Sequence, residues 1–423
     1  MSETVRVPIK VRQFPPPHLL IWPGHPEGSA IWRLRRAYRV AWRRRFDLRD
    51  YLHTSIGWLL WPLVAVLLAV QSTVKLGGAV ASSGGPSLLR QFAEQVWIAL
   101  LYRMVPRYYY IFELHRPAFR QHAAEYLTRV ETKSGIYRVL KQRGDRSKIV
   151  RINDKLVFSA FFGRQGLSVV PVFAAYRAGL RVGNVGDGTL PEGRDLFVKM
   201  IEGRGGTGAE LWQAERHGRY RSSRGEERTI EALIAHVLDL SKGGDYLVQP
   251  RLLNHPDIVD LTPGALSTVR LLTILNEQGE PEAVNAAFRM AISKTSPVDN
   301  FHAGGIAAAV DMATGKLGTA TGLGRGGDFR WHEKHPLTGA MIVGRQLPNW
   351  QETVALAVAA HRLVAPRVVV GWDIGFLPEG PCLVEGNVGP DADIHQRTEL
   401  RPIGNARYGE LLAFHMERRL GLS

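Results

Sequence analysis

The chain has 423 residues, of which 45% are hydrophobic and 22% charged, a composition typical of a folded protein with two or three domains. One cysteine, Cys382, excludes an intrachain disulfide and a cysteine-based metal cluster, and it fits a reducing compartment. The 54 lysines and arginines outnumber the 39 acidic residues, which gives a formal net charge of +15.

The first fifty residues carry much of this excess charge. They contain eleven basic and four acidic residues, and eight of the basic ones are arginines between Arg33 and Arg49. Trp32, Tyr38 and Trp42 are interleaved with these arginines, and the stretch 33–49 is expected to be helical. Nucleic acid or an anionic membrane surface could each explain such a segment. The segment that follows favours the membrane, so nucleic acid is not the expected partner.

An apolar run follows at residues 56–70, where fifteen residues contain no charged side chain. The run is shorter than the ~20 residues that a spanning helix needs, and Pro62 lies inside it. Two interpretations stay open. The run is either a helix buried in the protein core, or a hairpin or interfacial helix seated in a membrane surface.

Two further helices are predicted in the N-terminal region, over residues 88–102 and over residues 116–130, the second entered through Pro117. From about residue 150 the sequence pattern changes to short strand-like runs separated by glycine and proline, with helical stretches between them. The predicted strands cover residues 196–200, 246–250, 269–275, 305–311, 367–376 and 382–388, and the predicted helices cover residues 228–241 and 350–364. This alternation predicts a mainly helical region over residues 1–135 and an α+β domain over residues 136–423.

Near the C-terminal end, two strands carry oxygen ligands on one face. Asp373 lies towards the end of a valine-rich strand, and residues 377–381 turn the chain back. Glu385 and Asn387 share a face of the returning strand, because side chains alternate along a strand. In an antiparallel hairpin Asp373 can face them, and two carboxylates with an amide oxygen suit Mg²⁺.

Two lysines precede this hairpin. Lys199 lies in the strand-like run 196–200 and is followed by the glycine-rich sequence EGRGGTG at residues 202–208. Backbone N–H groups of such a loop can approach phosphate oxygens, and a lysine neutralises their charge. Lys155 stands earlier, in the segment Asn153–Lys155, and taken alone it would be interpreted as a surface lysine.

The order of these motifs resembles the ATP-grasp superfamily over residues 136–423. Within it, the runs DIVDLTPGALSTVRLLT (257–273) and VDNFHAGGIAAAVD (298–311), followed by GWDIGF and LVEGN, look like the sugar-transfer-associated ATP-grasp group. That group is related to the α-L-glutamate ligases. The resemblance implies an ATP-grasp fold in which two α+β lobes grip ATP, preceded here by the helical N-terminal region with its short apolar segment.

The resemblance also implies roles for individual residues. The phosphates of ATP would be contacted by Lys155, Lys199 and the loop glycines Gly203, Gly205, Gly206 and Gly208, and the backbone around Gln249 would meet the adenine. One or two Mg²⁺ ions, or Mn²⁺ in their place, would be held by Asp373, Glu385 and Asn387. Arg270, or otherwise Arg289, would stabilise the transferred phosphoryl group, although either arginine could instead be a structural ion-pair partner.

The chain departs from the pattern after Asn387, where the proline of many relatives lies closer to the asparagine than Pro390 does here. Asp391, Asp393 and His395 in this stretch could line the acceptor side of the site, but a solvated loop is the favoured interpretation.

The implied activity is that of a Mg-ATP-dependent ligase. Such an enzyme activates a carboxylate as an acyl-phosphate and transfers it to an amine or another nucleophile, here on a cell-surface glycan or its precursor. A kinase that phosphorylates a hydroxyl and a membrane-peripheral ATP-binding protein without ligase activity are the alternatives. Residues 30–75 would contact an anionic membrane surface or a lipid-linked glycan. A single span would place the ATP site outside the cell, where there is little ATP, so a cytoplasmic, peripheral or monotopic protein on the inner face is expected.

Overall fold

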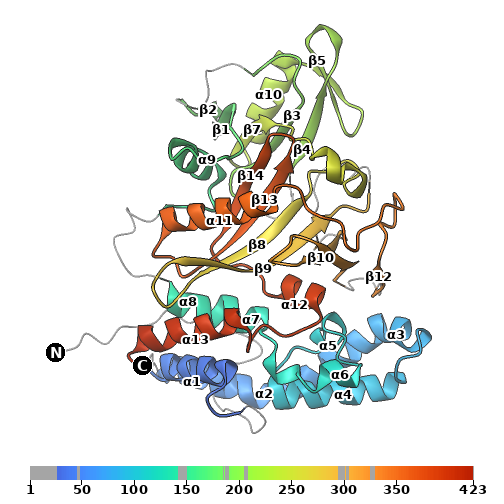
Figure 1. Ribbon diagram of the computed structural model, residues 1–423, viewed down its shortest axis with the longest axis vertical. Coiled ribbons are helices and arrows are strands. Elements are labelled where there is room, and N and C mark those ends of the chain that lie inside the picture. The colour runs from blue at the N-terminus through green and yellow to red at the C-terminus, as the bar shows by residue number, and fades with distance from the viewer. Residues whose placement is uncertain are drawn as a thin grey trace, which may run out of the picture.

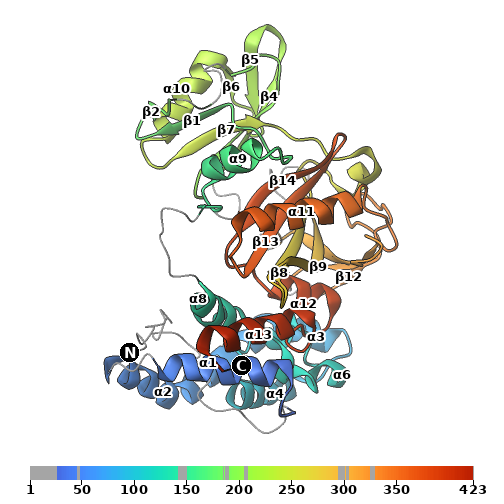
Figure 2. The same ribbon diagram turned by 60° about the vertical axis from the view of Figure 1, so that its left-hand side comes forward.

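The computed structural model describes residues 26–44, 48–141, 150–183, 185, 190–203, 208–293, 301, 304–323 and 329–422. An upper lobe, a middle sheet and a lower helical layer follow one another along the longest axis of the molecule (Figures 1 and 2). The chain is therefore α+β with a helical N-terminal region, as the sequence predicts.

The helical layer combines the first part of the chain with its last two helices. Its elements are α1 (Ala30–Arg43), α2 (Leu48–Ser72), η1 (Thr73–Gly77), α3 (Gly78–Ser82), α4 (Leu88–Tyr102), α5 (Tyr108–Ile111), α6 (Pro117–Arg120), η2 (Ala123–Glu125), α7 (Arg129–Glu131), η3 (Thr132–Ile136), α8 (Tyr137–Leu140), α12 (Asp393–Glu399) and α13 (Arg407–Leu420). The helix predicted over residues 88–102 is confirmed at both ends, and the Ser87 side chain caps its first turn.

The single helix predicted over residues 116–130 is wrong, because the chain there forms only the short pieces α6, η2 and α7. The guanidinium group of Arg35 explains the break. It donates to the carbonyl oxygens of Ala124 (2.6 Å) and Tyr126 (3.4 Å), and Arg35 also pairs with the buried carboxylate of Glu131. Arg35 thus supplies donors to two carbonyl oxygens that a continuous helix would bond to its own backbone N–H groups.

Part of the arginine-rich segment belongs to the core of the helical layer. Helix α1 packs along α13, and Tyr38 and Trp42 are buried in their shared apolar cluster. Arg33 pairs with Glu417 of α13, so this arginine is engaged within the fold. Arg36 and Arg43 lie on the exposed side of α1.

The apolar run lies in a much longer helical stretch than the sequence predicts. Helix α2 continues through the π-turn η1 into α3, and together they make 35 residues that are apolar and long enough to cross a membrane, by length and composition only. Only 28% of the most apolar window is buried. The interpretation of residues 56–70 as a buried core helix is therefore wrong, because most of their apolar side chains face outwards.

The upper lobe is an antiparallel sheet with the strand order β2-β1-β7-β3-β4-β5-β6, covered by α10. Its elements are α9 (Lys155–Arg164), β1 (Ala174–Arg177), β2 (Leu180–Arg181), β3 (Leu196–Met200), β4 (Glu210–Ala214), η5 (Arg216–Gly218), β5 (Arg219–Ser222), β6 (Glu227–Thr229), α10 (Ile230–Leu240) and β7 (Tyr246–Pro250). The strands predicted over residues 196–200 and 246–250 are confirmed as β3 and β7.

The middle sheet is also antiparallel, with the order β12-β11-β10-β9-β8-β13-β14. Its elements are η6 (Pro256–Leu261), β8 (Thr268–Leu275), β9 (Pro281–Met290), β10 (Ile306–Val310), β11 (Leu317–Thr321), β12 (Trp331–His332), α11 (Trp350–Val364), β13 (Val369–Leu377) and β14 (Gly380–Asn387). The predicted helix over residues 350–364 is confirmed as α11.

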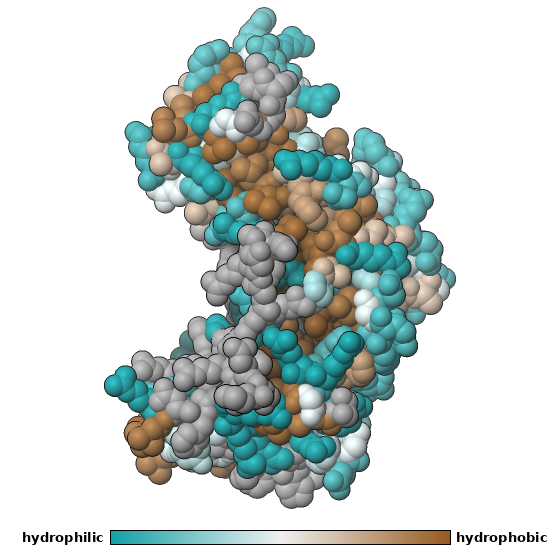
Figure 3. Space-filling view, turned by 90° about the vertical axis from the view of Figure 1, so that its left-hand side faces the viewer, coloured by the Kyte–Doolittle hydropathy of each residue, from teal (hydrophilic) through white to brown (hydrophobic). Residues whose placement is uncertain are grey.

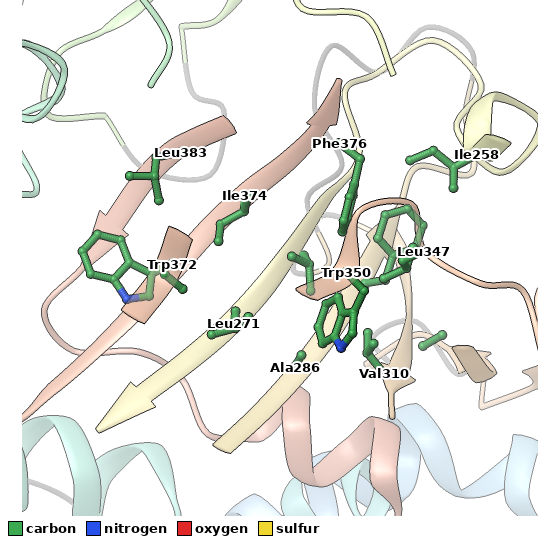
Figure 4. Packing of buried hydrophobic residues seen from close by; sticks show 14 of the residues in the cluster. Ile258, Leu271, Ala286, Val310, Leu347, Trp350, Trp372, Ile374, Phe376 and Leu383 are labelled. Atoms are coloured by element: carbon green, nitrogen blue, oxygen red, sulfur yellow. The ribbon is translucent and has the colours of Figure 1, made fainter. Parts of the chain in front are cut away.

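The two faces of the middle sheet differ, and this difference positions the site. On the face covered by α11, Leu271 of β8, Trp372 of β13 and Leu383 of β14 pack into one apolar core (Figure 4). The neighbouring residues of the same strands point to the opposite face, because side chains alternate. Leu272 and Ile274 of β8 accordingly pack into the helical layer. Arg270 and Asp373 belong to this second face.

Candidate active site

A carboxylate held by two arginines lies on the second face of the middle sheet. Arg270 of β8 stands opposite Asp373 of β13 in the strand register, and its Nε and Nη2 atoms donate to the two carboxylate oxygens. Arg289 of β9 reaches the same carboxylate with its Nη2 atom, 3.1 Å from Oδ2. Burial raises the pKa of Asp373, but the two arginines outweigh it and hold that pKa below its ordinary value. The predicted residues Arg270, Arg289 and Asp373 thus form one cluster.

Glu385 and Asn387 complete the predicted oxygen set. Glu385 stands opposite Asp373 in the ladder of β13 and β14, and Asn387 stands opposite Gly371. Among the described residues, no three His, Cys, Asp or Glu side chains form a group that could hold a metal ion. The predicted set contains two carboxylates and one amide, with hard oxygen atoms that fit Mg²⁺ or Mn²⁺. The Nδ2 atom of Asn387 has no hydrogen-bond partner within the described chain, whereas the Asp373 carboxylate is shared with both arginines.

Lys199 connects the upper lobe to this cluster. It lies on β3, and burial together with the nearby charge of Lys155 lowers its pKa to about 8. The charges of Glu385 and Asp373 act on the same ammonium group in the opposite direction. The lysine of one sheet and the carboxylates of the other are therefore within electrostatic reach of each other.

Lys155 has a different environment from the surface position suggested by its local sequence. It is the first residue of α9, which Asp154 caps by accepting from the backbone N–H groups of Leu156 and Val157. The Nζ atom of Lys155 is 3.2 Å from the carbonyl oxygen of Ile201 and 3.1 Å from that of Gly203. The lysine thus ties α9 to the start of the glycine-rich loop.

The structure describes only some of the other residues predicted to bind the nucleotide. Gly205 and Gly206 lie outside the described residues. Gly208 adopts a positive φ of 70°, and an added Cβ there would lie 2.9 Å from the Tyr246 hydroxyl oxygen, so the loop returns close to β7. The side chain of Gln249 is buried, with Nε2 3.4 Å from the carbonyl oxygen of Val170, and its backbone stands opposite Phe197 in the β3–β7 ladder.

The segment after β14 is a buried part of the site, and its interpretation as a solvated loop is wrong. Asp391, Asp393 and His395 are all buried. The reason is the close approach of Pro390 to Gly371: an added Cβ on this glycine would lie 2.7 Å from the Pro390 Cβ and 3.5 Å from the Arg270 Cδ. The missing side chain at Gly371 lets the segment fold down beside the arginine.

Sequence reasoning missed the contribution of the helical layer. The Nζ atom of Lys133, in η3, is 2.9 Å from Asp391 Oδ1, and Arg129 Nε of α7 is 3.3 Å from the same oxygen. The Tyr108 hydroxyl of α5 lies 3.4 Å from Asp393 Oδ2. These residues come from very short helices more than 250 positions earlier, and no spacing motif connects them with the C-terminal segment.

The comparison with protein families agrees with this geometry. The family described as sugar-transfer associated ATP-grasp matches residues 138–402, which is more than half of the chain. The chain belongs to this family. The resemblance inferred from the ordered motifs is thereby confirmed, and so is the ATP-grasp fold.

Solved structures similar to this ATP-grasp chain are distant. D-alanyl-alanine synthetase A from Vibrio cholerae is 12% identical over 64% of this chain and 66% of its own, with a TM-score of 0.35. D-alanine–D-alanine ligase from Bacillus anthracis, solved with ATP, is 12% identical over 64% and 67%, with a TM-score of 0.36. An N5-carboxyaminoimidazole ribonucleotide synthetase in complex with ADP is 10% identical over 66% and 53%, with a TM-score of 0.36. No curated protein matches the chain.

Proposed function

We propose that the chain is a Mg-ATP-dependent ligase, which activates a carboxylate as an acyl-phosphate and transfers the acyl group to an amine. The convergence of Lys199 from the upper sheet with Asp373 and Glu385 from the middle sheet carries this proposal, since a nucleotide between the sheets would meet groups of both signs. A bound divalent cation would neutralise charge on the phosphate oxygens. Arg270 and Arg289 lie beside that position and would stabilise the transferred phosphoryl group.

The nucleotide site can be tested by thermal stabilisation. Ligand at ~100 times its dissociation constant adds about 2.7 kcal/mol to the free energy of unfolding. We expect Mg-ATP to raise the melting temperature of the wild type, and we expect Lys199→Ala and Glu385→Ala to lose the shift. Lys242→Ala is the matched control, because this lysine is 70% exposed and pairs only with Asp239 in the described chain. An equal shift in all four proteins would reject the site.

The reaction type can be tested by product analysis with candidate acids and amines. A ligase forms ADP and inorganic phosphate in equal amounts, whereas a kinase forms ADP and a phosphorylated product without free phosphate. ADP formation without phosphate release would therefore replace the ligase with the kinase. The family description, sugar-transfer associated, supports an acceptor that carries a sugar. We propose a cell-surface glycan or its precursor, and a lipid-linked sugar is the first acceptor to try.

The exposed face of α2 supports peripheral or monotopic binding of the protein to the cytoplasmic face of a membrane. Seven exposed apolar residues of α2 and the adjoining η1 follow one another at intervals of three or four positions: Leu52, Ile56, Leu59, Leu63, Leu67, Val70 and, in η1, Val74. Such spacing places them on one side of the helix. The face lies at the lower end of the molecule, away from both sheets (Figures 1 and 2). Helix α1 beside it exposes Arg36 and Arg43, which would meet anionic headgroups.

If this face of α2 binds the membrane, substitutions on it should weaken binding to lipid vesicles. Leu59 and Leu63 are 79% and 60% exposed, so changing both to aspartate should leave the fold intact. Each leucine contributes about 1.5 kcal/mol or more when it is buried in lipid, so binding to phosphatidylglycerol–phosphatidylcholine vesicles should fall at least ~100-fold. Leu180→Asp in the upper lobe, at a leucine 71% exposed, is the matched control. Equal vesicle binding by the double variant and the control would show that this face of α2 does not bind the membrane.

A further inference from the structure

A short helical run of the N-terminal region lies against the segment that follows β14. The elements α7, η3 and α8 follow one another directly over residues 129–140, and they lie on the side of the helical layer that faces the middle sheet (Figures 1 and 2). Arg129, Lys133 and Tyr137 are spaced by four positions, which places their side chains on one side of this run. All three lie against the segment at residues 389–391.

The contacts with this segment fix where the two cations stand. An added Cβ on Gly389 would lie 3.7 Å from Cδ2 of Tyr137. The Oδ1 atom of Asp391 lies 2.9 Å from Nζ of Lys133 and 3.3 Å from Nε of Arg129. Strand β14, which carries two of the predicted metal ligands, ends two positions before Gly389. The two cations of the helical layer are therefore held a few residues from the predicted metal-binding set.

Arg270 of the middle sheet lies beside the same segment. An added Cβ on Gly371 would lie 2.7 Å from the Cβ of Pro390 and 3.5 Å from the Cδ of Arg270, and Pro390 directly precedes Asp391. Burial lowers the pKa of Lys133, and the charge of Arg270 acts on it in the same direction. The cations of the helical layer are therefore neighbours of an arginine that is proposed to stabilise the transferred phosphoryl group.

Arg107 adds a third cation from the helical layer. Its charge and that of Arg129 both act on Asp393. The Tyr108 hydroxyl connects the two places, because it donates to Asp393 Oδ2 (3.4 Å) and accepts from the backbone N–H of Arg129 (3.2 Å). Arg107 is exposed, and in the described part of the chain it forms no ion pair with a carboxylate. We call Arg107, Arg129 and Lys133 the basic cluster.

Positive charge exceeds negative charge around the basic cluster. The three cations face two carboxylates, those of Asp391 and Asp393. Burial and the charge of Asp391 raise the pKa of Asp393 to about 7, so this carboxyl group is only partly ionised at neutral pH. The Asp391 side chain is 12% exposed, whereas those of Arg129 and Lys133 are 40% and 30% exposed. The two cations thus cover the carboxylate and keep part of each side chain open to an anionic ligand.

The number of donors in the basic cluster selects the kind of anion. Each guanidinium carries five N–H donors and the ammonium carries three. A phosphate monoester has close to two negative charges and three acceptor oxygens, so it can bond cations from separate helices at once, whereas a carboxylate has one charge and two oxygens. We propose that the basic cluster binds a phosphate group of the acceptor, and that the acceptor is a sugar phosphate or a lipid-linked sugar diphosphate. This inference rests on the proposed ligase function and names the substrate class of the same site.

The position of the basic cluster agrees with this assignment. Figure 3 shows that the molecule is hollowed on one side, between the upper lobe and the helical layer. The helical layer closes the lower end of this hollow, and α7 and α8 lie on its upper side (Figure 1). A phosphate bound by the cluster would hold the attached sugar beside Arg270, where the acyl-phosphate is proposed to form.

The first test measures stabilisation by phosphate-bearing probes. D-Glucosamine 1-phosphate, geranyl diphosphate, inorganic phosphate and D-glucosamine are added singly to the wild type with saturating Mg-ATP, so that the nucleotide site is already occupied. We expect D-glucosamine 1-phosphate or geranyl diphosphate to raise the melting temperature further, and D-glucosamine to leave it unchanged. No increment from any phosphate probe, an increment from inorganic phosphate alone, or an equal increment from D-glucosamine would overturn the proposal.

The second test locates the stabilising probe by isothermal titration calorimetry. Lys133→Gln is combined with Asp391→Asn, which keeps the net charge and leaves no carboxylate without its cation. Arg107→Gln removes an exposed cation and keeps the test valid if the double variant does not fold. We expect each variant to weaken binding ~10-fold, because a charge-assisted bond is lost. Arg90→Gln is the matched control, since this arginine of the same layer is 62% exposed and pairs with Glu94. Affinities equal to that of the control would overturn the proposal.

Failure of this proposal can be told apart from failure of the ligase. If Mg-ATP does not stabilise the wild type, the nucleotide site is rejected, and the phosphate probes are then titrated without nucleotide. Weaker binding by Arg107→Gln in that experiment would still support the phosphate site. If Mg-ATP stabilises the wild type and the phosphate probes do not, the acceptor carries no phosphate and the nucleotide site stands.

Discussion

The buried side chain of Arg397 pairs with Glu113 inside the helical layer and also bonds β11 of the middle sheet, so we expect the layer and the sheet to unfold together. Arg397 is fully buried on α12 and donates to Glu113 Oε1 (2.6 Å), to Thr321 Oγ1 of β11 (2.8 Å) and to the Gly322 carbonyl oxygen (3.2 Å). Removing one partner of a buried pair costs about 3–5 kcal/mol, because the other charge stays buried. Trp331 and Arg116 also contact Glu113 and would compensate in part, so we expect Arg397→Met to lose ~3 kcal/mol.

Urea unfolding followed by tryptophan fluorescence measures this loss. Arg407→Met is the control. Arg407 is 41% exposed and pairs with Glu277 and Glu282 at the surface. We therefore expect Arg407→Met to lower the free energy of unfolding by less than ~1 kcal/mol. Changing Glu113 to leucine together with Arg397→Met should restore part of the stability, because no charge is then left buried. A loss below ~1 kcal/mol for Arg397→Met alone would refute the reasoning and show that the layer and the sheet are loosely joined.

Two further predictions concern stability and the shape of the site. Burial lowers the pKa of His361 to about 4, against ~6.5 in the unfolded chain, so stability is fully present above pH 6.5 and is lost as pH falls towards 4, by up to ~3 kcal/mol. We expect urea unfolding at several pH values to show that the free energy of unfolding of His361→Leu falls less steeply between pH 6.5 and pH 4 than that of the wild type. The same dependence of stability on pH in both proteins would contradict the prediction. Gly371→Ala places a Cβ against Pro390 and should destabilise the chain by ~1–3 kcal/mol and reduce phosphate release, whereas Gly279→Ala in an open turn with positive φ should affect stability alone.

The elements that sequence reasoning located correctly are those with a strong local pattern. The strands at residues 196–200 and 246–250 and the helix at residues 350–364 are bounded by turn residues and have the right periodicity. The set of Asp373, Glu385 and Asn387 could be predicted to share one face because a hairpin connects its two strands. In each case the information lies within about twenty residues of sequence.

The parts that could not be predicted depend on partners far away in the chain. The helix expected over residues 116–130 is broken because Arg35, about ninety positions earlier, takes two of its carbonyl groups. Asp391 and Asp393 look like a solvated acidic loop until Lys133 and Tyr108 are placed against them. Local polarity predicts exposure in both cases, and only the tertiary structure supplies the compensating partners.

The pairing of α1 with α13 has a consequence for how the protein is made. Ile31 and Asn405, which are 374 positions apart, are joined by a hydrogen bond, and the apolar surface of α1 is covered chiefly by α13. During synthesis α1 leaves the ribosome long before its partner exists, at roughly 5–20 residues per second. For that interval the apolar side of α1 is uncovered, next to the face of α2 that stays exposed in the folded protein. A lipid surface or a chaperone that receives this segment early would keep the nascent chain from aggregating.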